Sequence, residues 1–443
     1  MNLFEKRRGP FYDLWETASG RLRSRVRRQR LADYLRLARQ VPFYKGRLGN
    51  ADLKAEHPLA GVPVLSSDDL RALVPPKSRR LLTRPGEAFT VFQSGGTTGF
   101  PKSALFASEE IDGLDLPNAR GFYAVGLKPS DRVANLWAAG SLYMTFIHIN
   151  RMLQGYGCAS FPLSNHAAPE FTAMVARLFK TNCVTGISSV VLNALRALSG
   201  PGARSLRIEK VYYGGEHLYE ADKEWLRHTF GTKVIAAPGY GTIDSWYIGY
   251  QCLRCPTGVF HCHDDQCLLE IVDEETGRAT GPGETGMAYA TAFPRRLTPI
   301  VRYRVGDLAQ WVASPCPCGR TTPLFKLLGR GDDVLRIGFD SIAYGQVVEC
   351  VAEVRGLSGS VLMRKERRNG RDRLAVEVET EAPVSAQGRL AAEVLRRLLV
   401  QRPTLAKAVA AGEVQPPLVR CARPGSLPRN PRTGKLVRVQ DSV

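Results

Sequence analysis

The chain has 443 residues, 44% of them hydrophobic and 23% charged, which is the balance of a soluble globular protein with two or three domains. It contains no apolar run of about 18 residues, which excludes a transmembrane helix, and its N-terminal segment lacks the apolar stretch of a secretory signal. We therefore expect a cytoplasmic protein without a membrane partner.

The net charge of +19 is concentrated at the two ends of the chain. Residues 1–50 hold 13 Lys and Arg against 4 Asp and Glu, and residues 401–443 hold 8 against 2, so the two ends contribute +9 and +6. Such a field favours anionic partners, among them ATP, the phosphates of coenzyme A, an acidic carrier protein and nucleic acid. A solvated helical face explains the arginines more simply. Because aromatic interleaving and zinc-finger spacing are both missing from the sequence, nucleic acid is the partner that we expect least.

In chain order, the first element is a helix over residues 22–41, which Pro42 ends. The middle of the chain then alternates apolar runs of strand length with helical stretches. Strands are expected at 88–92, 133–137, 157–161, 211–213 and 234–236, and helices at 169–179 and 188–197. This alternation indicates an α/β domain with a mostly parallel sheet.

After residue 268 the pattern changes to short antiparallel strands with tight turns, over 268–272 and 285–291. A boundary is expected near residues 329–333, followed by strands at 358–364 and 373–379 and a helix at 386–399. We therefore predict an α/β fold with a large N-terminal domain over 1–330, part of it β-rich, and a small mobile α+β lid over 331–443.

A loop of nine residues, S-G-G-T-T-G-F-P-K, follows the expected strand at 88–92. Its glycines let backbone N–H groups approach an anion, while its hydroxyls and its lysine add donors and positive charge. The spacing is neither that of a Walker loop nor that of a Rossmann motif. We interpret it as a phosphate-binding loop, with a solvated linker as the alternative; the candidate phosphate ligands are Ser94, Gly95, Gly96, Thr97, Thr98, Gly99 and Lys102.

Further motifs lie before and after this loop in the chain. They read V-P-F-Y at 41–44, Y-G-G-E at 213–216, Y-G-T-I-D at 240–244, Y-R-V-G-D at 303–307, G-R-G-D-D at 329–333 and P-R-T-G-K at 431–435. Together with the loop, they resemble the adenylate-forming ligases, and most closely the phenylacetate–coenzyme A ligase branch. The resemblance covers most of the chain.

The resemblance implies an AMP-binding adenylation domain over 1–330 and a lid that rotates between two half-reactions about a hinge at Asp332. It implies that Lys435 stabilises charge during adenylation and that Asp244 holds magnesium. It places the ribose at Asp307, with Arg330 supporting it. The remaining nucleotide-binding positions would be Gly215, Glu216, Tyr240, Gly241 and Thr242. The implied cofactors are ATP, Mg²⁺ and coenzyme A.

Two positions depart from the family pattern. The metal-binding acid is usually Glu, whereas Asp244 has a side chain one methylene shorter. The segment 337–342 after the hinge also differs from that of relatives, which puts the organisation of the second half-reaction in doubt.

Ten cysteines in a cytoplasmic chain favour metal binding or buried thiols over disulfides. Two close pairs, C-x-x-C and C-P-C, would give a tetrahedral structural zinc site if the segment 252–318 brought them together, and the resemblance suggests a metal in some relatives. Five candidate ligands compete for four positions, and unmetallated core cysteines are the alternative; the candidates are Cys252, Cys255, His261, Cys316 and Cys318.

The candidate acyl pocket is indicated by residue types and by no motif. Aromatic residues and a histidine gather in the segment 135–148, and Trp137, Tyr143 and His148 are the candidates for the pocket. They favour an aromatic or otherwise flat acid, although aromatic residues at this density also suit a hydrophobic core.

The function that these features predict is ATP-dependent activation of a carboxylic acid to an acyl-adenylate, followed by transfer to the thiol of coenzyme A. Delivery to a carrier protein or to an amine is the nearest alternative. Transfer of AMP to a cofactor hydroxyl and a non-catalytic nucleotide- and zinc-binding role are more distant ones.

Overall fold

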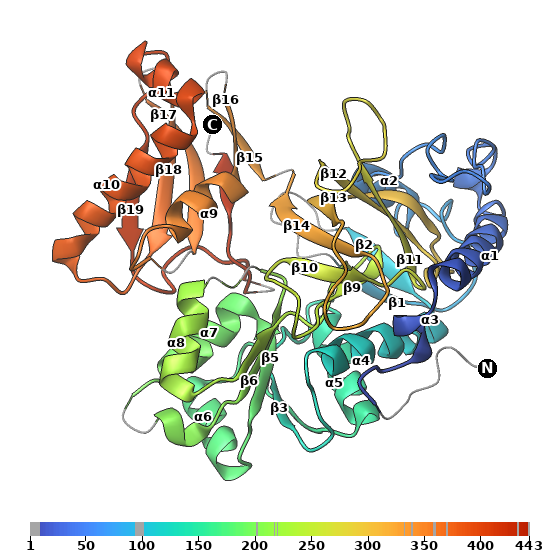
Figure 1. The fold of residues 1–443 in the computed structure, drawn as a ribbon, viewed down its shortest axis with the longest axis horizontal. Coiled ribbons are helices and arrows are strands. Elements are labelled where there is room, and N and C mark those ends of the chain that lie inside the picture. The colour runs from blue at the N-terminus through green and yellow to red at the C-terminus, as the bar shows by residue number, and fades with distance from the viewer. Residues whose placement is uncertain are drawn as a thin grey trace.

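The computed structural model describes residues 9–93, 102–200, 203–216, 218, 220–331, 333–337, 340–357, 360–368, 371–431 and 434–441. Figure 1 shows a parallel sheet with its helices, a β-rich part beside it and a C-terminal unit packed above. This mixed α/β architecture confirms the predicted fold class. In the described part of the chain, no helix has the length and apolar character needed to cross a bilayer.

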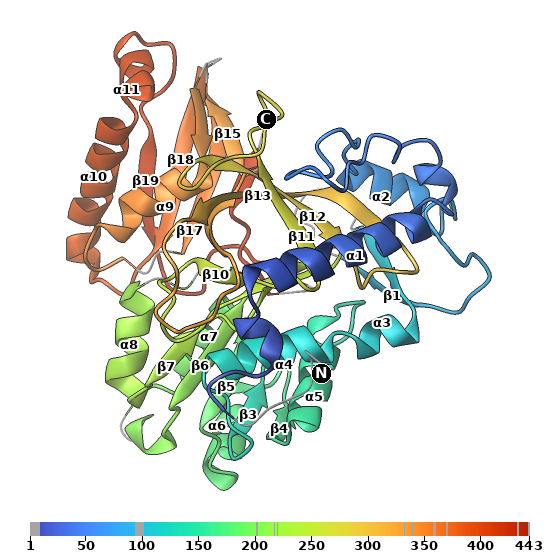
Figure 2. The same ribbon diagram turned by 45° about the vertical axis from the view of Figure 1, so that its right-hand side comes forward.

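The N-terminal segment packs across the β-rich part (Figure 2). Its long helix α1 (Gly20–Ala38) begins where the Ser19 side chain accepts a hydrogen bond from the Leu22 N–H, which is an N-cap. The helix stops three residues before the predicted end, because the chain turns there into a short 3₁₀ helix with Pro42 at its start. The Tyr34 hydroxyl donates to the carbonyl of Arg295 and ties α1 to the β-rich part. The other short elements are η1 (Leu14–Thr17), η2 (Pro42–Tyr44) and α2 (Ser67–Leu73).

A five-stranded sheet of order β4-β3-β5-β6-β7 forms the centre of the α/β part, and every neighbouring pair in it is parallel. The predicted alternation of strand and helix is therefore confirmed. The strands are β3 (Arg132–Asn135), β4 (Ala159–Pro162), β5 (Cys183–Ile187), β6 (Lys210–Gly214) and β7 (Val234–Ala236). The helices of this part are α3 (Ser108–Asp112), α4 (Asp115–Ala124), α5 (Thr145–Tyr156), α6 (Pro169–Leu178), α7 (Ser188–Ala197), η3 (Ala203–Leu206) and α8 (Glu220–Phe230).

The β-rich part is a seven-stranded antiparallel sheet of order β11-β12-β13-β14-β10-β9-β8, with the hairpin of β1 (Thr90–Gln93) and β2 (Ser103–Phe106) beside it. One large hydrophobic core joins this sheet to α1 and to the parallel sheet. The strands of the sheet are β8 (Tyr240–Thr242), β9 (Trp246–Tyr250), β10 (Val259–Cys262), β11 (Cys267–Val272), β12 (Thr285–Ala292), β13 (Ile300–Val312) and β14 (Leu324–Arg330).

The C-terminal unit has a hydrophobic core of its own, which includes Val347, Val376 and Leu398. Its four-stranded sheet has the order β19-β18-β17-β20. The strands are β15 (Val334–Ile337), β16 (Asp340–Ala343), β17 (Val361–Arg368), β18 (Arg371–Glu379), β19 (Leu418–Ala422) and β20 (Val439–Asp441), and the helices are α9 (Tyr344–Ala352), α10 (Val384–Gln401) and α11 (Pro403–Ala410).

Candidate functional site

The lysine of the predicted phosphate-binding loop lies in a polar cluster at the start of β2. Lys102 Nζ is 2.6 Å from Asp244 Oδ2, and it also contacts the hydroxyl of Tyr303. Burial alone would lower the pKa of Lys102, but the Asp244 carboxylate and the Tyr303 hydroxyl raise it above its ordinary value, so the ammonium form is held firmly. The other candidates of the loop, Ser94, Gly95, Gly96, Thr97, Thr98 and Gly99, lie outside the described residues.

Two members of this cluster were not singled out from the sequence. The Tyr303 hydroxyl is 3.3 Å from Asp244 Oδ2 and 3.1 Å from the hydroxyl of Ser67. Tyr303 stands first in the motif Y-R-V-G-D, so the motif was the signal that could have found it. Ser67 belongs to none of the motifs; it is the first residue of α2 and contacts the cluster from there.

Asp244 lies in a tight turn between β8 and β9, and this turn fixes its position. The Thr242 hydroxyl accepts a hydrogen bond from the Ser245 N–H at 3.0 Å, which closes the turn around Asp244. A Cβ on Gly241 would lie 2.1 Å from the carbonyl oxygen of Trp246, so only glycine fits there. Asp244 itself is buried.

A second carboxylate, that of Asp307, lies opposite Arg330 on the paired strands β13 and β14. Its Oδ2 accepts a hydrogen bond of 2.6 Å from the Tyr240 hydroxyl, and its Oδ1 is 3.6 Å from Arg330 Nη1. Burial raises the pKa of Asp307, while Arg330 and the Tyr240 hydrogen bond oppose that rise. The structure therefore brings together three of the predicted nucleotide-binding residues.

Lys435 reaches the main body of the protein from the C-terminal unit and lies over Gly215, just beyond the end of β6. A Cβ on Gly215 would be 3.0 Å from Lys435 Cε and 3.2 Å from Nζ, and Gly215 has a φ of +76°. The preceding glycine, Gly214, faces the ring of Trp137, because a Cβ there would lie 3.0 Å from Trp137 Cη2. Two of the predicted site segments and one acyl-pocket candidate thus meet at a single strand end.

Glu216 is also at this junction, where its side chain contacts the protein backbone. Its Oε1 accepts a hydrogen bond of 2.5 Å from the Leu436 N–H, and its Oε2 accepts one of 3.1 Å from the Ser189 N–H. The predicted hinge, Asp332, lies outside the described residues, but the neighbouring Asp333 is 3.4 Å from Arg438.

The three acyl-pocket candidates are all buried, and two of them have polar partners inside the protein. Trp137 Nε1 donates to the Thr185 hydroxyl at 3.0 Å, and His148 Nδ1 is 3.2 Å from the side-chain nitrogen of Asn118. Burial lowers the pKa of His148 to about 3, so the ring is neutral at physiological pH. Tyr143 packs in the same hydrophobic cluster as Trp137.

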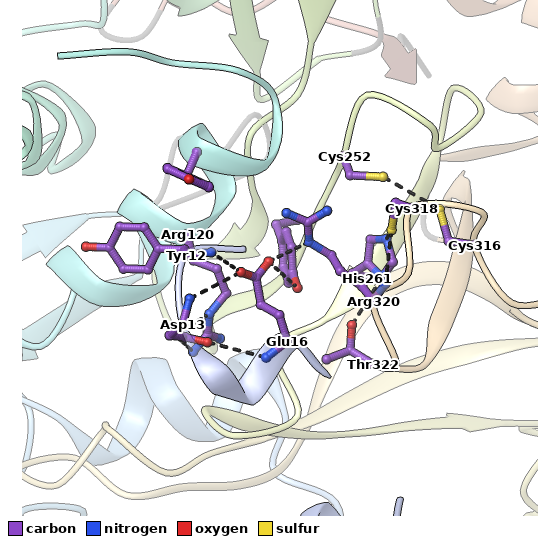
Figure 3. Close-up of polar contacts among 12 residues, drawn as sticks. Tyr12, Asp13, Glu16, Arg120, Cys252, His261, Cys316, Cys318, Arg320 and Thr322 are labelled. Carbon is purple, nitrogen blue, oxygen red and sulfur yellow. Dashed lines mark hydrogen bonds and ion pairs between the residues drawn. The ribbon is translucent and has the colours of Figure 1, made fainter. Parts of the chain in front are cut away.

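The five Cys and His candidates form one cluster between the β9–β10 and β13–β14 connections, and Figure 3 shows four of them, Cys252, His261, Cys316 and Cys318. Cys252 Sγ is 3.5 Å from Cys255 Sγ and 3.6 Å from Cys316 Sγ, and the ligand atoms of these three residues and His261 all lie within 4.8 Å of one another. Cys318 Sγ is 3.4 Å from His261 Nε2. Zinc–sulfur bonds of ~2.3 Å in a tetrahedron place sulfur atoms about 3.8 Å apart, so the observed spacing suits zinc.

Groups behind the cluster hold it in place, and no motif in the sequence marks them. The Thr322 hydroxyl is 3.1 Å from His261 Nδ1, so that Nε2 faces the sulfur atoms. The Arg320 N–H donates to Cys318 Sγ at 3.4 Å, and the Arg320 guanidinium pairs at 2.5 Å with Glu16, which is fully buried in η1 (Figure 3). The N-terminal segment therefore buttresses a site whose other parts lie more than two hundred residues away.

No family model matches the chain. The phenylacetate–coenzyme A ligase of Thermus thermophilus is 26% identical over 418 residues, covering 91% of this chain and 92% of the relative, and that of Pseudomonas putida is 24% identical over 390 residues, covering 86% and 87%.

Among solved structures, 2-hydroxyisobutyryl-CoA ligase in its postadenylation state, in complex with 2-HIB-AMP, aligns with a TM-score of 0.80 at 22% identity, covering 100% of this chain and 94% of that one. In its thioesterification state the same ligase aligns with a TM-score of 0.65 at 22% identity, covering 98% of this chain and 92% of that one. The resemblance deduced from the motifs is confirmed: the chain is homologous to the phenylacetate–coenzyme A ligases over most of its length and has the fold of the adenylate-forming enzymes.

Proposed function

We propose that this protein is an AMP-forming acid–thiol ligase, which activates a carboxylic acid as its acyl-adenylate and then transfers the acyl group to coenzyme A. The observation that carries the proposal is the position of Lys435, which lies against Gly215 at the end of a parallel strand. This is the edge of a sheet at which ligands of α/β proteins bind. The full-length similarity to phenylacetate–coenzyme A ligases supports the same reaction.

In this proposal, the two anionic reactants are brought together by positive charge from two directions. The loop that ends at Lys102 would hold the β- and γ-phosphates, and Lys435 would stabilise the α-phosphate and the carboxylate as charge develops between them. Asp307 would accept hydrogen bonds from the ribose hydroxyls, with Tyr240 and Arg330 fixing its orientation.

Magnesium is compatible with the residues at Asp244. Asp244 would hold the ion, and its Oδ2 is also in contact with Lys102 and Tyr303. A single carboxylate completed by substrate phosphates and water is a common way of binding Mg²⁺. The bound ion would neutralise phosphate charge.

The two half-reactions would use two orientations of the C-terminal unit, which we assign to residues 331–443, with Asp332 as the hinge and 1–330 as the adenylation domain. The higher TM-score against the postadenylation state than against the thioesterification state supports a first-step orientation for the arrangement described here. In this orientation the nucleotide would also meet Gly215, Gly241 and Thr242.

The acid that we propose is aromatic, and it would lie against Trp137 next to Gly214, with the buried Tyr143 and the neutral His148 as the other candidates for the pocket. Its final acceptor is a thiol in this proposal. An assay that offers coenzyme A, a carrier protein or an amine to the preformed adenylate would separate the three acceptors.

We further propose that the Cys/His cluster binds one structural zinc through His261 and three of the four thiolates. Four protein ligands leave no open coordination position, so the ion would have no direct catalytic role. Single Cys→Ser variants of Cys252, Cys255, Cys316 and Cys318, followed by metal analysis, would identify the thiol that is not a ligand.

The function is tested by acid-dependent exchange of pyrophosphate into ATP with a library of aryl and alkyl acids. We expect exchange with aryl acids and the release of AMP when coenzyme A is added. If AMP appears instead in the final product, or if every acid in the panel fails, the proposed ligase reaction is wrong. A cytoplasmic site of action stays a prediction.

A further inference from the structure

The carboxylate of Glu216 joins two segments that belong to different parts of the molecule. One oxygen accepts the N–H of Leu436, the residue after Lys435, and the other accepts the N–H of Ser189 in the first turn of α7. The backbone carbonyl of Glu216 accepts a third hydrogen bond, of 2.9 Å, from the Ser188 hydroxyl. Glu216 is therefore fixed to α7 on one side and holds the C-terminal chain on the other.

The chain that Glu216 holds is a small hairpin with Lys435 near its end. Arg429 and Leu436 form an antiparallel bridge, the Asn430 N–H donates to the carbonyl of Lys435 at 2.7 Å, and the Gly434 N–H donates to the carbonyl of Asn430 at 2.8 Å. These bonds join the described residues on the two sides of the turn before Lys435 within the C-terminal unit. They do not by themselves fix the lysine relative to the strand end where Gly215 lies.

That second restraint comes from contacts across the boundary between the two parts. The Ser189 hydroxyl donates to the carbonyl of Gly434 at 3.4 Å, and a Cβ on Gly434 would be 2.9 Å from Val190 Cγ2, so the hairpin lies tightly on α7. Farther along α7, Arg196 is 3.2 Å from Glu381 of the C-terminal unit. Of these contacts, the one from Glu216 is made to the residue directly after Lys435.

We propose that Glu216 is a positioning residue that sets the ammonium of Lys435 for adenylation, and not a residue that binds the nucleotide. The proposal rests on the function proposed above. Hydrogen bonds from backbone N–H groups to a carboxylate are charge-assisted and short, and the N-terminus of α7 adds a favourable field for the negative charge. The bond to Leu436 exists only while the C-terminal unit has this orientation, so Glu216 serves the first half-reaction alone.

The carboxylate is required because both partners are donors. A glutamine at this position offers one acceptor oxygen and one NH₂ group, so one of the two backbone N–H groups faces another donor. Glu216→Gln keeps the size of the side chain and removes one of the two restraints. The matched control is Glu224→Gln, which removes the charge of an exposed glutamate on α8.

The first arm of the test measures both half-reactions. For Glu216→Gln we expect kcat of ATP–pyrophosphate exchange to fall by about 10- to 100-fold, because small misplacements of a catalytic group have effects of this size. We expect KM for ATP to stay within about 3-fold, and thioester formation from synthetic acyl-adenylate and coenzyme A to be unchanged. A rise in KM for ATP with kcat retained would mean direct nucleotide contact, and an equal loss in both half-reactions would mean a general defect. Either result overturns the proposal.

The second arm does not depend on activity, so it separates failure of this proposal from failure of the proposed function. Hydrogen–deuterium exchange is followed in peptides that cover residues 429–438 of the full-length protein. We expect faster exchange there in Glu216→Gln and no change in Glu224→Gln. Unchanged protection in Glu216→Gln overturns the proposal even if no acid supports pyrophosphate exchange in the unsubstituted protein.

Discussion

The Cys/His cluster and the Lys435 hairpin are both places where distant segments meet, but they are built in different ways. The cluster draws its ligands from connections within one antiparallel sheet, with His261 on β10 between β9 and β14. The hairpin meets the main body through a few hydrogen bonds across a boundary, of which those to Glu216 and Ser189 are the nearest to Lys435.

Because of this difference, we expect disruption of the cluster to affect the stability of the fold and disruption of the hairpin to affect the reaction. A site enclosed by one sheet can be rigid at all times, and disrupting it should affect the folded state first. A site completed by a second unit has to open and close, so disrupting it should affect the reaction while the fold survives. The following predictions test this contrast.

The largest effect is expected in the cluster. Cys316→Ser should lower zinc content from about one ion per chain and reduce the free energy of unfolding by more than about 4 kcal/mol, as losses of a metal site do. Metal analysis and denaturant unfolding measure the two quantities. Cys421→Ser, in β19 and away from the cluster, should change neither. A zinc-free but equally stable wild-type protein would contradict the cluster proposal.

The second largest effect is expected for the ion pair between Glu16 and Arg320, which lies behind the cluster. Glu16→Gln leaves the buried guanidinium of Arg320 without its charged partner, and breaking a buried ion pair in this way costs about 3–5 kcal/mol. Unfolding by denaturant measures the loss, with exposed Glu56→Gln as the control. Exchange activity per folded molecule should stay near the wild-type level; if activity falls while stability is kept, the ion pair and the nucleotide site are not separate.

The hairpin should show the opposite pattern. Lys435→Ala should reduce the rate of ATP–pyrophosphate exchange by about 10²–10³-fold, the usual effect of removing one electrostatic group from an active site, with the free energy of unfolding nearly unchanged. KM for ATP should change little, because the loop and Asp307 would still hold the nucleotide. Lys407→Ala, at an exposed position on α11, is the control. Full exchange in Lys435→Ala would remove our assignment of this lysine.

The smallest effect concerns pH at the boundary between the two parts. Burial raises the pKa of Asp222, which contacts Arg196, to about 7. The folded protein therefore keeps a proton that the unfolded chain, with a pKa of about 3.9, has lost, so the contribution of Asp222 to stability is full below about pH 4 and declines as the pH rises through 7.

Asp222→Asn should remove this dependence. Between pH 5 and pH 8 we expect wild-type stability to fall relative to the variant by on the order of 2 kcal/mol. Denaturant midpoints of both proteins at the two pH values measure it, and Glu224→Gln should follow the wild type. Parallel pH profiles for Asp222→Asn and wild type would contradict the raised pKa.

Local patterns were enough to predict much of the fold. The helices at 169–178 and 188–197 were found because their apolar residues recur at helical spacing, and the strands around them because short apolar runs alternate with those helices. The end of α1 was placed three residues too late, because Pro42 was taken as the residue that stops the helix, whereas the chain already turns after Ala38.

The candidate site was predictable only in part. Short motifs singled out Asp244, Asp307 and Lys435 as candidates, but which side chains contact one another depends on tertiary packing. The bond between Glu216 and Leu436 spans 220 positions of the chain, and the pair of Glu16 and Arg320 spans 304. Sequence periodicity carries no information about contacts at such separations.

The two glycines on either side of the boundary have a mechanical consequence. A Cβ would lie 2.9 Å from Val190 Cγ2 at Gly434 and 3.0 Å from Lys435 Cε at Gly215, and both glycines have a positive φ angle. An alanine at either position would therefore combine a strained backbone with a closer contact, and would weaken the fit of the C-terminal unit against the parallel sheet and α7.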